Sequence, residues 1–243
     1  MGKWLWARYT AVLHKSNACG EIQMRLYYLT NEIHALSNLE KRRLKISRFS
    51  TLNDPFELMP VKAGDPKHRR AIYQFKKQID KDKGLICFSK TWENPVLWGH
   101  YGDKHKGIAL GLEVEKSVAN RVIYSNKLID IPVDPITHRA RPDEKLVNSI
   151  LRTKSKDWRY EDEWRVFFEL KNETAESGLY FSKFFNEMEL KEVVLGPNCT
   201  TTSSKVASLL KNYTEKIQIT KARIAFNSFR VFKDQSALTI FNR

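Results

Sequence analysis

The chain has 243 residues, which is near the upper limit for one domain and enough to bury a large core. Hydrophobic residues make up 42% of it and aromatic residues 12%, and these globular values exclude a largely disordered chain. Lys and Arg number 42 against 28 Asp and Glu, which gives a formal net charge of +14. A surplus of this size attracts polyanions, most commonly nucleic acid, although it also serves solubility alone.

The cysteine and hydropathy patterns indicate a reducing compartment. Cys19, Cys87 and Cys199 are far apart and form no Cys-x-x-Cys pair, so we predict neither a disulfide framework nor a zinc site. The first ten residues lack the apolar core of a secretory signal, and no apolar run approaches bilayer length. We therefore expect a cytoplasmic protein without bound metal or membrane contact.

Short strands and helices follow one another without a strict βαβ order, which predicts a single compact α+β domain over residues 26–243. Its sheet should be mixed and largely antiparallel, with helices packed around it, and residues 1–25 should be an N-terminal extension. The expected strands lie near residues 26–29, 44–47, 85–88, 107–112, 122–124, 164–168, 193–195, 217–219 and 229–232. The expected helices lie at about residues 31–41, 66–81, 95–101, 142–154 and 203–213.

Capping signals mark two of these helices. Thr30 or Asn31 is expected to cap the first helix, whose apolar face would hold Ile33, Leu36 and Leu39. Asn94, followed by Pro, is expected to open the short third helix, because Pro is favoured in a first turn.

A polar loop follows the second expected strand and contains Asn53, Asp54, Pro55, Phe56 and Glu57. Asn and Asp before Pro are turn residues, because their side chains hydrogen-bond to nearby backbone. The structural interpretation is a turn that docks Phe56 in the core. The functional alternative is that Asn53, Asp54 and Glu57 line a cleft at the end of that strand.

A second group combines Ser89 with the aromatic segment at residues 98–107, which contains Trp98, His100 and Tyr101. These residues offer flat rings and one imidazole that titrates near neutrality. A single His among aromatic residues is more often a structural hydrogen-bonding group than a catalyst. The glycines of this segment permit close approach of a ligand, but they form no phosphate-binding loop.

The densest group of charged and aromatic residues lies at residues 154–165. Read as a strand, this segment places Glu161, Glu163 and Arg165 on one face, opposite its aromatic residues. Read as a helix, the same spacing gives Glu161 and Arg165 an i,i+4 ion pair. Asp162 is unfavourable on the apolar face of a strand, so the strand itself is expected to begin near Glu163. The structural alternative is a ladder of ion pairs on a solvated face.

Together, these segments resemble a bacterial family known as domain-of-unknown-function family 2971. The likeness lies in Leu-Tyr-Tyr-Leu at 26–29, Asn-Asp-Pro-Phe-Glu at 53–57, Cys-Phe-Ser at 87–89, residues 98–107 and residues 158–165. It spans roughly residues 26–232, and the order and spacing of the motifs are specific. Leu29 departs from the pattern, where a second Tyr is usual. This resemblance implies no established activity.

The order of elements and the late Glu-x-Glu are also similar, more distantly, to ADP-ribosyltransferases, which cleave the nicotinamide–ribose bond of NAD. The likeness implies NAD as cofactor and assigns the Glu-x-Glu to Glu161 and Glu163, with Glu163 essential. It implies Tyr101 or Tyr160 as the ring that stacks on nicotinamide. The chain lacks the family's Ser-Thr-Ser and a clear His or Arg on the first strand, and Ser47 and Ser89 are only loose substitutes.

We therefore expect an NAD-dependent, ADP-ribosyltransferase-like effector, of toxin or anti-phage type, that acts on nucleic acid or on a target bound to it. Its expected catalytic residues are Glu163, Glu161 and His100. The residues expected to bind substrate or cofactor are Tyr28, Asn53, Asp54, Glu57, Ser89, Trp98, Tyr101, Tyr160 and Arg165.

Two other functions stay open. A non-catalytic module would bind nucleic acid through its basic clusters, at Lys41, Arg42, Arg43, Arg69, Arg70, Lys76 and Lys77. A metal-dependent nuclease would use Asp54, Glu57 and Glu163, but it ranks last because no recognised metal-ligand spacing supports it.

Overall fold

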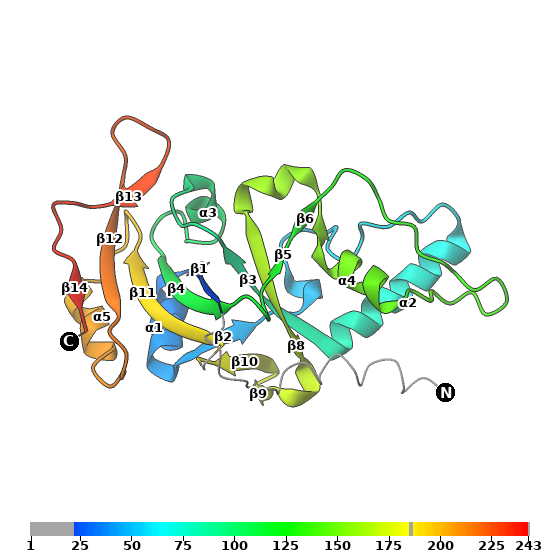
Figure 1. Ribbon diagram of the computed structural model, residues 1–243, viewed down its shortest axis with the longest axis horizontal. Helices are drawn as coiled ribbons and strands as arrows, with labels where there is room; N and C mark the ends of the chain where they lie inside the picture. The colour runs from blue at the N-terminus through cyan, green and yellow to red at the C-terminus, as the bar shows by residue number, and fades with distance from the viewer. Residues whose placement is uncertain (1–21, 185–186, 243) are drawn as a thin grey trace.

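The fold is centred on one curled, mostly antiparallel sheet (Figure 1). The computed structural model describes residues 22–184 and 187–242. In spatial order the strands are β13 (Val231–Lys233), β12 (Gln218–Ile224), β11 (Met188–Leu195), β4 (Ile108–Glu115), β1 (Gln23–Thr30), β3 (Lys83–Ser89), β8 (Glu163–Glu169) and β5 (Asn120–Arg121), with β14 (Ile240–Phe241) beside β12. The β11–β12 pair is parallel, and the other pairs of this sheet are antiparallel. The predicted α+β class and sheet type are confirmed.

Smaller sheets and the helices complete the domain. A second sheet has the order β2 (Arg43–Ile46), β10 (Leu179–Lys183) and β9 (Thr174–Glu176), and β6 (Ile123–Tyr124) pairs with β7 (Thr153–Lys154). The α-helices are α1 (Glu32–Lys41), α2 (Pro66–Asp82), α3 (Pro95–His100), α4 (Glu144–Arg152) and α5 (Ser203–Leu209). The 3-10 helices are η1 (Phe49–Thr51), η2 (Lys156–Glu161) and η3 (Leu170–Asn172). Within the two described ranges, no helix is both long and apolar enough to cross a membrane.

The α-helices begin where a polar side chain can accept a hydrogen bond from their first turn. The side chain of Asn31 accepts from the amide of His34 and caps α1, and Asn94 caps α3 by accepting from the amide of Val96. The capping positions predicted from the sequence are confirmed, with Asn31 rather than Thr30 at the first. α1 ends at Arg42, whose left-handed backbone closes the helix.

The core is built on both faces of the sheet. β4 supplies apolar residues to both faces, and Leu110 and Ala109 are both 0% exposed. Leu39 of α1 and Val206 of α5 pack on the face that holds Leu110, whereas Trp98 of α3 packs on the face that holds Ala109. A further apolar cluster lies under α2 and α4, at the other end of the molecule (Figure 1). The sheet therefore holds α3, whose segment carries several expected site residues, rigidly against one face.

Two apolar side chains lie where the sequence does not place them. Ile33 is 78% exposed, and the buried residues of α1 are Ala35, Asn38 and Leu39, of which Leu39 was expected. Phe56 is 68% exposed, whereas Leu58, two residues later, is 1% exposed and fills the core. The expected docking of Phe56 in the core is therefore wrong: the turn at residues 53–57 leaves Phe56 in solvent, while Glu57 and Leu58 on either side of its end are buried.

The segments around residues 26 and 160 also differ in part from the prediction. β1 begins at Gln23, so the expected boundary at residue 26 falls inside a strand, and residues 1–21 lie outside the described residues. Residues 156–161 form η2 rather than a strand. Asp162 has a left-handed backbone with φ of 40°, and β8 begins at Glu163, as predicted.

Candidate functional site

Five charged side chains meet in the interior between β8, β7, η2 and the loop after η1, and we call them the ionic cluster. They are Glu57, Lys154, Glu161, Glu163 and Arg165, and their exposed fractions are 3%, 5%, 2%, 4% and 0%. Charges are rarely buried to this extent unless they are paired, because removal from water is costly. The structure thus brings together four expected site residues and one, Lys154, that the sequence does not single out.

Arg165 is the centre of the cluster. Its Nη2 and Nη1 donate to the two carboxylate oxygens of Glu57, at 2.6 and 3.0 Å. Its Nε donates to Oε1 of Glu163 at 2.7 Å, and Nη1 also donates to the carbonyl of Leu151 at 2.8 Å. The guanidinium donors are therefore used in a paired geometry that suits carboxylates, and this compensates its burial.

Lys154 faces the same carboxylates from β7. Its Nζ lies 2.7 Å from Glu161, 3.3 Å from Glu163 and 3.7 Å from Glu57. Burial alone would lower the pKa of Lys154, but the three carboxylates raise it above its ordinary value. Lys154 therefore stays charged.

The cluster holds three carboxyl groups and two cations, and the two central glutamates respond differently. Burial works to raise the pKa of Glu163, but Arg165 and Lys154 outweigh it and hold the pKa at about 2. Burial raises the pKa of Glu161, although Lys154 works against this rise. Glu161 is therefore the carboxyl group of this pair that takes up a proton more easily.

A hydrogen-bond chain connects the ionic cluster to the surface. Nδ2 of Asn53, an exposed residue, donates to the hydroxyl of Tyr101 at 3.0 Å, and that hydroxyl donates in turn to Oε1 of Glu161 in a short hydrogen bond. Burial and the negative charge of Glu161 raise the pKa of Tyr101, so the phenol keeps its proton. The half-buried Tyr101 is thus the polar link between solvent and Glu161.

Three aromatic rings stand beside this chain, and we call them the ring cluster. They are those of His100, Trp158 and Tyr160, and each pair of ring centres is 6.0 or 6.1 Å apart. His100 is exposed and the other two are half-buried. Nζ of Lys154 lies 4.5 Å from the ring centre of Trp158, so the ring cluster borders the ionic cluster.

Local hydrogen bonds hold α3 and η2 together. Nδ2 of Asn94 donates to the carbonyl of Tyr160 at 2.9 Å, while the same side chain caps α3. The hydroxyl of Ser89 donates to the carbonyl of Glu161 at 2.7 Å, and the hydroxyl of Tyr124 accepts from the amide of Glu163 at 2.8 Å. Ser89 thus positions Glu161 through its backbone.

Other expected binding residues have partners outside the ionic and ring clusters. Tyr28 packs edge-on against Phe88 in the core. Trp98 is 0% exposed, and its Nε1 donates to the carbonyl of Trp92 at 2.6 Å. The carboxylate of Asp54 accepts from the amide of Phe56 at 2.9 Å and closes a turn. These contacts are those of packing and turn residues.

The first basic group lies at the end of α1 and the start of β2. Lys41 and Arg43 both pair with Glu176, at 3.3 and 2.5 Å. The guanidinium of Arg42 lies 4.4 Å from the ring centre of Tyr213. This group is therefore partly neutralised and partly packed on an aromatic ring.

The second basic group lies on α2 and consists of Arg69, Arg70, Lys76 and Lys77. Arg69, Arg70 and Lys77 are exposed, and Lys76 is half-buried. Nη1 of Arg69 donates to the carbonyl of Gly64 at 3.1 Å. Across residues 22–184 and 187–242, no carboxylate lies at ion-pair distance from Arg70, Lys76 or Lys77. The positive charge of α2 is thus directed to solvent.

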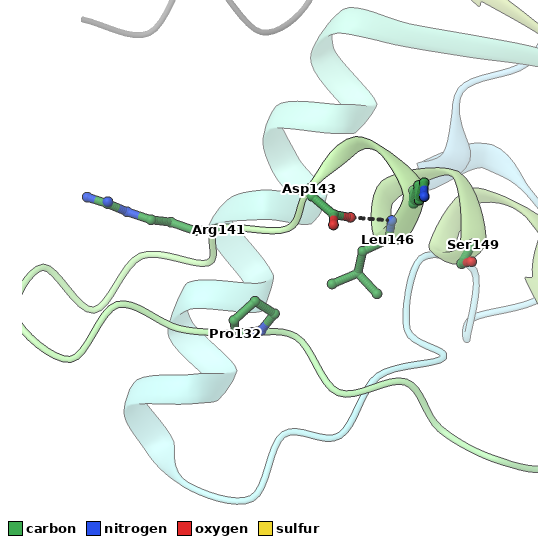
Figure 2. A pocket seen from close by; sticks show the side chains of 6 residues that line it. Pro132, Arg141, Asp143, Leu146 and Ser149 are labelled. Carbon is green, nitrogen blue, oxygen red and sulfur yellow. Dashed lines mark hydrogen bonds between the residues drawn. The ribbon is translucent and has the colours of Figure 1, made fainter.

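A surface pocket of about 430 Å³ lies elsewhere, beside the start of α4 (Figure 2). It is lined by Pro132, Arg141, Asp143, Lys145, Leu146 and Ser149. The carboxylate of Asp143 accepts from the amide of Leu146 at 2.8 Å and caps α4, as Figure 2 shows. No residue of the ionic cluster or the ring cluster lines this pocket.

The nuclease hypothesis placed metal ligands at Asp54, Glu57 and Glu163. Among the described residues, no group of three or more His, Cys, Asp and Glu side chains is arranged to hold a metal ion. Glu57 and Glu163 instead face Arg165, and Asp54 accepts from a backbone amide.

The comparisons with known proteins give one similarity. Residues 97–166 match the model of a family described as "Protein of unknown function (DUF2971)". This range covers the ring cluster, Tyr101 and every member of the ionic cluster except Glu57. No curated protein and no solved structure matches the chain. The expected similarity to this family is thus supported over a shorter range than the motifs at residues 26–29, 53–57 and 87–89 suggested.

Proposed function

We propose that this chain is an enzyme of the ADP-ribosyltransferase type, which binds NAD at the ring cluster and transfers its ADP-ribose unit. The supporting observation is that the ring cluster adjoins the hydrogen bonds that run from Asn53 through Tyr101 to Glu161. The ring centres of His100 and Tyr101 are 6.0 Å apart. Flat rings suit a flat heterocycle such as nicotinamide, whereas the polar chain suits the hydroxyl groups of ribose.

Glu161, rather than Glu163, is the carboxylate that we assign to the reacting ribose. Arg165 and Lys154 hold both oxygens of Glu163, so its charge is already compensated. Glu161 accepts a hydrogen bond from one cation, Lys154, and Tyr101 links it to the surface. A carboxylate in the interior exerts a stronger electrostatic effect on a nearby positive charge than one in water.

In the proposed reaction the bond between nicotinamide and C1 of the ribose breaks, and nicotinamide leaves with the bonding electrons. The acceptor forms a new bond to C1 and releases a proton. Ionised Glu161 would stabilise the positive ribose that develops between these events. Burial raises the pKa of Glu161, which is the direction that favours uptake of the released proton.

The experiment measures nicotinamide release from NAD, with and without RNA or DNA. Glu161→Gln should lose on the order of 100-fold in rate, because it removes a preorganised charge. Trp158→Ala should raise the KM for NAD by about tenfold, within the range for loss of one stacking ring. The matched controls are Glu40→Gln, an exposed glutamate on α1, and Tyr73→Ala, an aromatic residue of α2 that is 62% exposed. Both controls should retain full activity.

The proposal fails if the wild-type chain neither binds NAD nor releases nicotinamide with any of these acceptors. It also fails if Glu161→Gln and Glu40→Gln have the same rate. Circular dichroism of each variant separates loss of activity from loss of fold.

The exposed basic face of α2 favours a second candidate function, a nucleic-acid-binding module without catalysis. Arg70 and Lys77 point their charge to solvent without a carboxylate partner in the described part of the chain. The double variant Arg70→Gln/Lys77→Gln should weaken binding to all oligonucleotides and lower its salt dependence, since fewer counterions are released. An unchanged affinity at low salt would argue against this function.

A further inference from the structure

The loop between β12 and β13, residues 225–230, projects from the body of the molecule (Figure 1). It carries two phenylalanines, Phe226 and Phe229, which are 88% and 98% exposed. Phe is among the residues most often buried, so two nearly fully exposed rings in one short loop mark a contact surface.

The fold fixes the base of this loop. Ile224 pairs with Val231 across the two strands, and the amide of Ala225 donates to the carbonyl of Arg230 at 2.9 Å. Val231 is 0% exposed, which anchors the base of the loop in the core. The loop is therefore closed at its base, and both rings lie in solvent beyond it.

Cationic side chains flank the rings. The guanidinium carbon of Arg223 lies 4.8 Å from the ring centre of Phe226. Arg230 is 61% exposed at its side chain and lies 3.3 Å from Glu93. Aromatic rings beside arginine side chains are the combination that single-stranded nucleic acid needs, since bases stack on rings while phosphates meet cations.

The loop is also joined to the candidate site. The amide of Val231 donates to the carbonyl of Glu93 at 2.8 Å, and Arg230 pairs with the side chain of the same residue. The next residue, Asn94, caps α3 and donates to the carbonyl of Tyr160 in the ring cluster. Residues 93–94 therefore connect the base of the loop to α3, which carries His100, and to Tyr160 of η2.

We propose that this loop docks single-stranded nucleic acid, with Phe226 and Phe229 stacked on two bases and Arg223 near the backbone. The strand would then be the acceptor, or carry the acceptor, of the proposed ADP-ribose transfer, and this role alone depends on the proposed function. A duplex hides its base faces in the stack, so the exposed rings favour a single strand. A lipid surface fits less well, because the polar Asn227 and Ser228 stand between the two rings.

The experiment measures binding of the full chain to fluorescent single-stranded DNA and RNA 20-mers, without NAD. The same sequence as a duplex and vesicles with phosphatidylserine are tested in parallel, over a range of salt concentrations. Phe226→Ala/Phe229→Ala should weaken single-strand binding by about tenfold or more, since each stacked base contributes about 1–3 kcal/mol. Its salt dependence should stay as in the wild type, because the phosphate contacts remain. The matched control, Tyr73→Ala, should bind as the wild type does.

Three outcomes would overturn this inference. The first is that the wild type and the double phenylalanine variant bind single strands with equal affinity. The second is that this variant loses vesicle binding but keeps oligonucleotide binding. The third is that only Arg70→Gln/Lys77→Gln loses affinity for oligonucleotides. Nicotinamide release by the double phenylalanine variant, measured without acceptor, should equal that of the wild type. The binding assay therefore tests whether the loop binds nucleic acid, and nicotinamide release tests separately whether the protein uses NAD.

Discussion

Glu163→Gln is the variant by which the ionic cluster can be tested most directly. Glu163 accepts from Nε and Nη2 of Arg165, at 2.7 and 3.1 Å, and from Nζ of Lys154 at 3.3 Å. Glutamine keeps the shape but removes the charge, and its amide group would face a cation with donors of its own. Removal of one partner from a buried ion pair typically costs about 3–5 kcal/mol. That is a large part of the roughly 5–15 kcal/mol by which domains are stable.

The assay is thermal and urea unfolding followed by circular dichroism. For a chain of this length, each kcal/mol shifts the Tm by about 2–4 °C, so Glu163→Gln should melt roughly 6–20 °C below the wild type. Glu40→Gln, which changes an exposed glutamate in the same way, should stay within about 0.5 kcal/mol. A Tm for Glu163→Gln equal to that of Glu40→Gln would refute the view that the cluster is a tightly coupled structural unit.

Two further predictions concern pH and packing. Because the pKa of Glu163 falls from its ordinary 4.5 to about 2 on folding, it contributes about 3 kcal/mol that is present above pH 4.5 and lost as the pH falls toward 2. Acid unfolding should therefore be shallower for Glu163→Gln than for the wild type, and parallel curves would contradict this sign. Gly107→Ala should destabilise the chain by about 3 kcal/mol, because the new Cβ would lie 2.1 Å from the carbonyl oxygen of Thr30. Gly99→Ala, in α3 with nothing within 4 Å, should instead stabilise it by about 0.5–1 kcal/mol, as urea titrations of the two variants can show.

Local signals predicted the starts of helices well. Asn31 and Asn94 cap α1 and α3 because capping depends on a side chain and the two or three amides that follow it. The burial of an apolar residue depends on distant neighbours, and this is why Ile33 was misplaced. Its side chain is 78% exposed, whereas Leu39 on the same helix meets the sheet.

Some of the elements that the sequence did not predict depend on contacts with remote parts of the chain. β10 was missed; it pairs with its neighbour β9 and also with β2 from a remote part of the chain, where Ile46 lies opposite Tyr180. η2 follows an alternating pattern typical of a strand, but Asn94, from another loop, binds the carbonyl of Tyr160, and Asp162 turns the chain. The contact with Asn94 is not visible within the segment itself, whereas Asp162 already predicted that the strand begins near Glu163.

The sequence predicted most residues of the candidate site but not how they are arranged. Glu161, Glu163 and Arg165 were expected to lie together, because strand spacing places alternate residues on one face. The partner of Arg165 on the other side, Glu57, is 108 residues away in the sequence. Lys154 had no distinguishing pattern, since one Lys among several in a basic chain gives no sign that it is buried.

The separation of Glu57 and Arg165 has a consequence for the order of folding. A long loop must close before these two charges can meet, and closure of a long loop is entropically unfavourable until other contacts offset it. Neither charge can leave water before its partners arrive, so the cluster should assemble late, after β3 and β8 have paired. Interactions formed late slow the unfolding rate more than they speed folding. The ionic cluster should thus slow global unfolding and so determine the lifetime of the folded state.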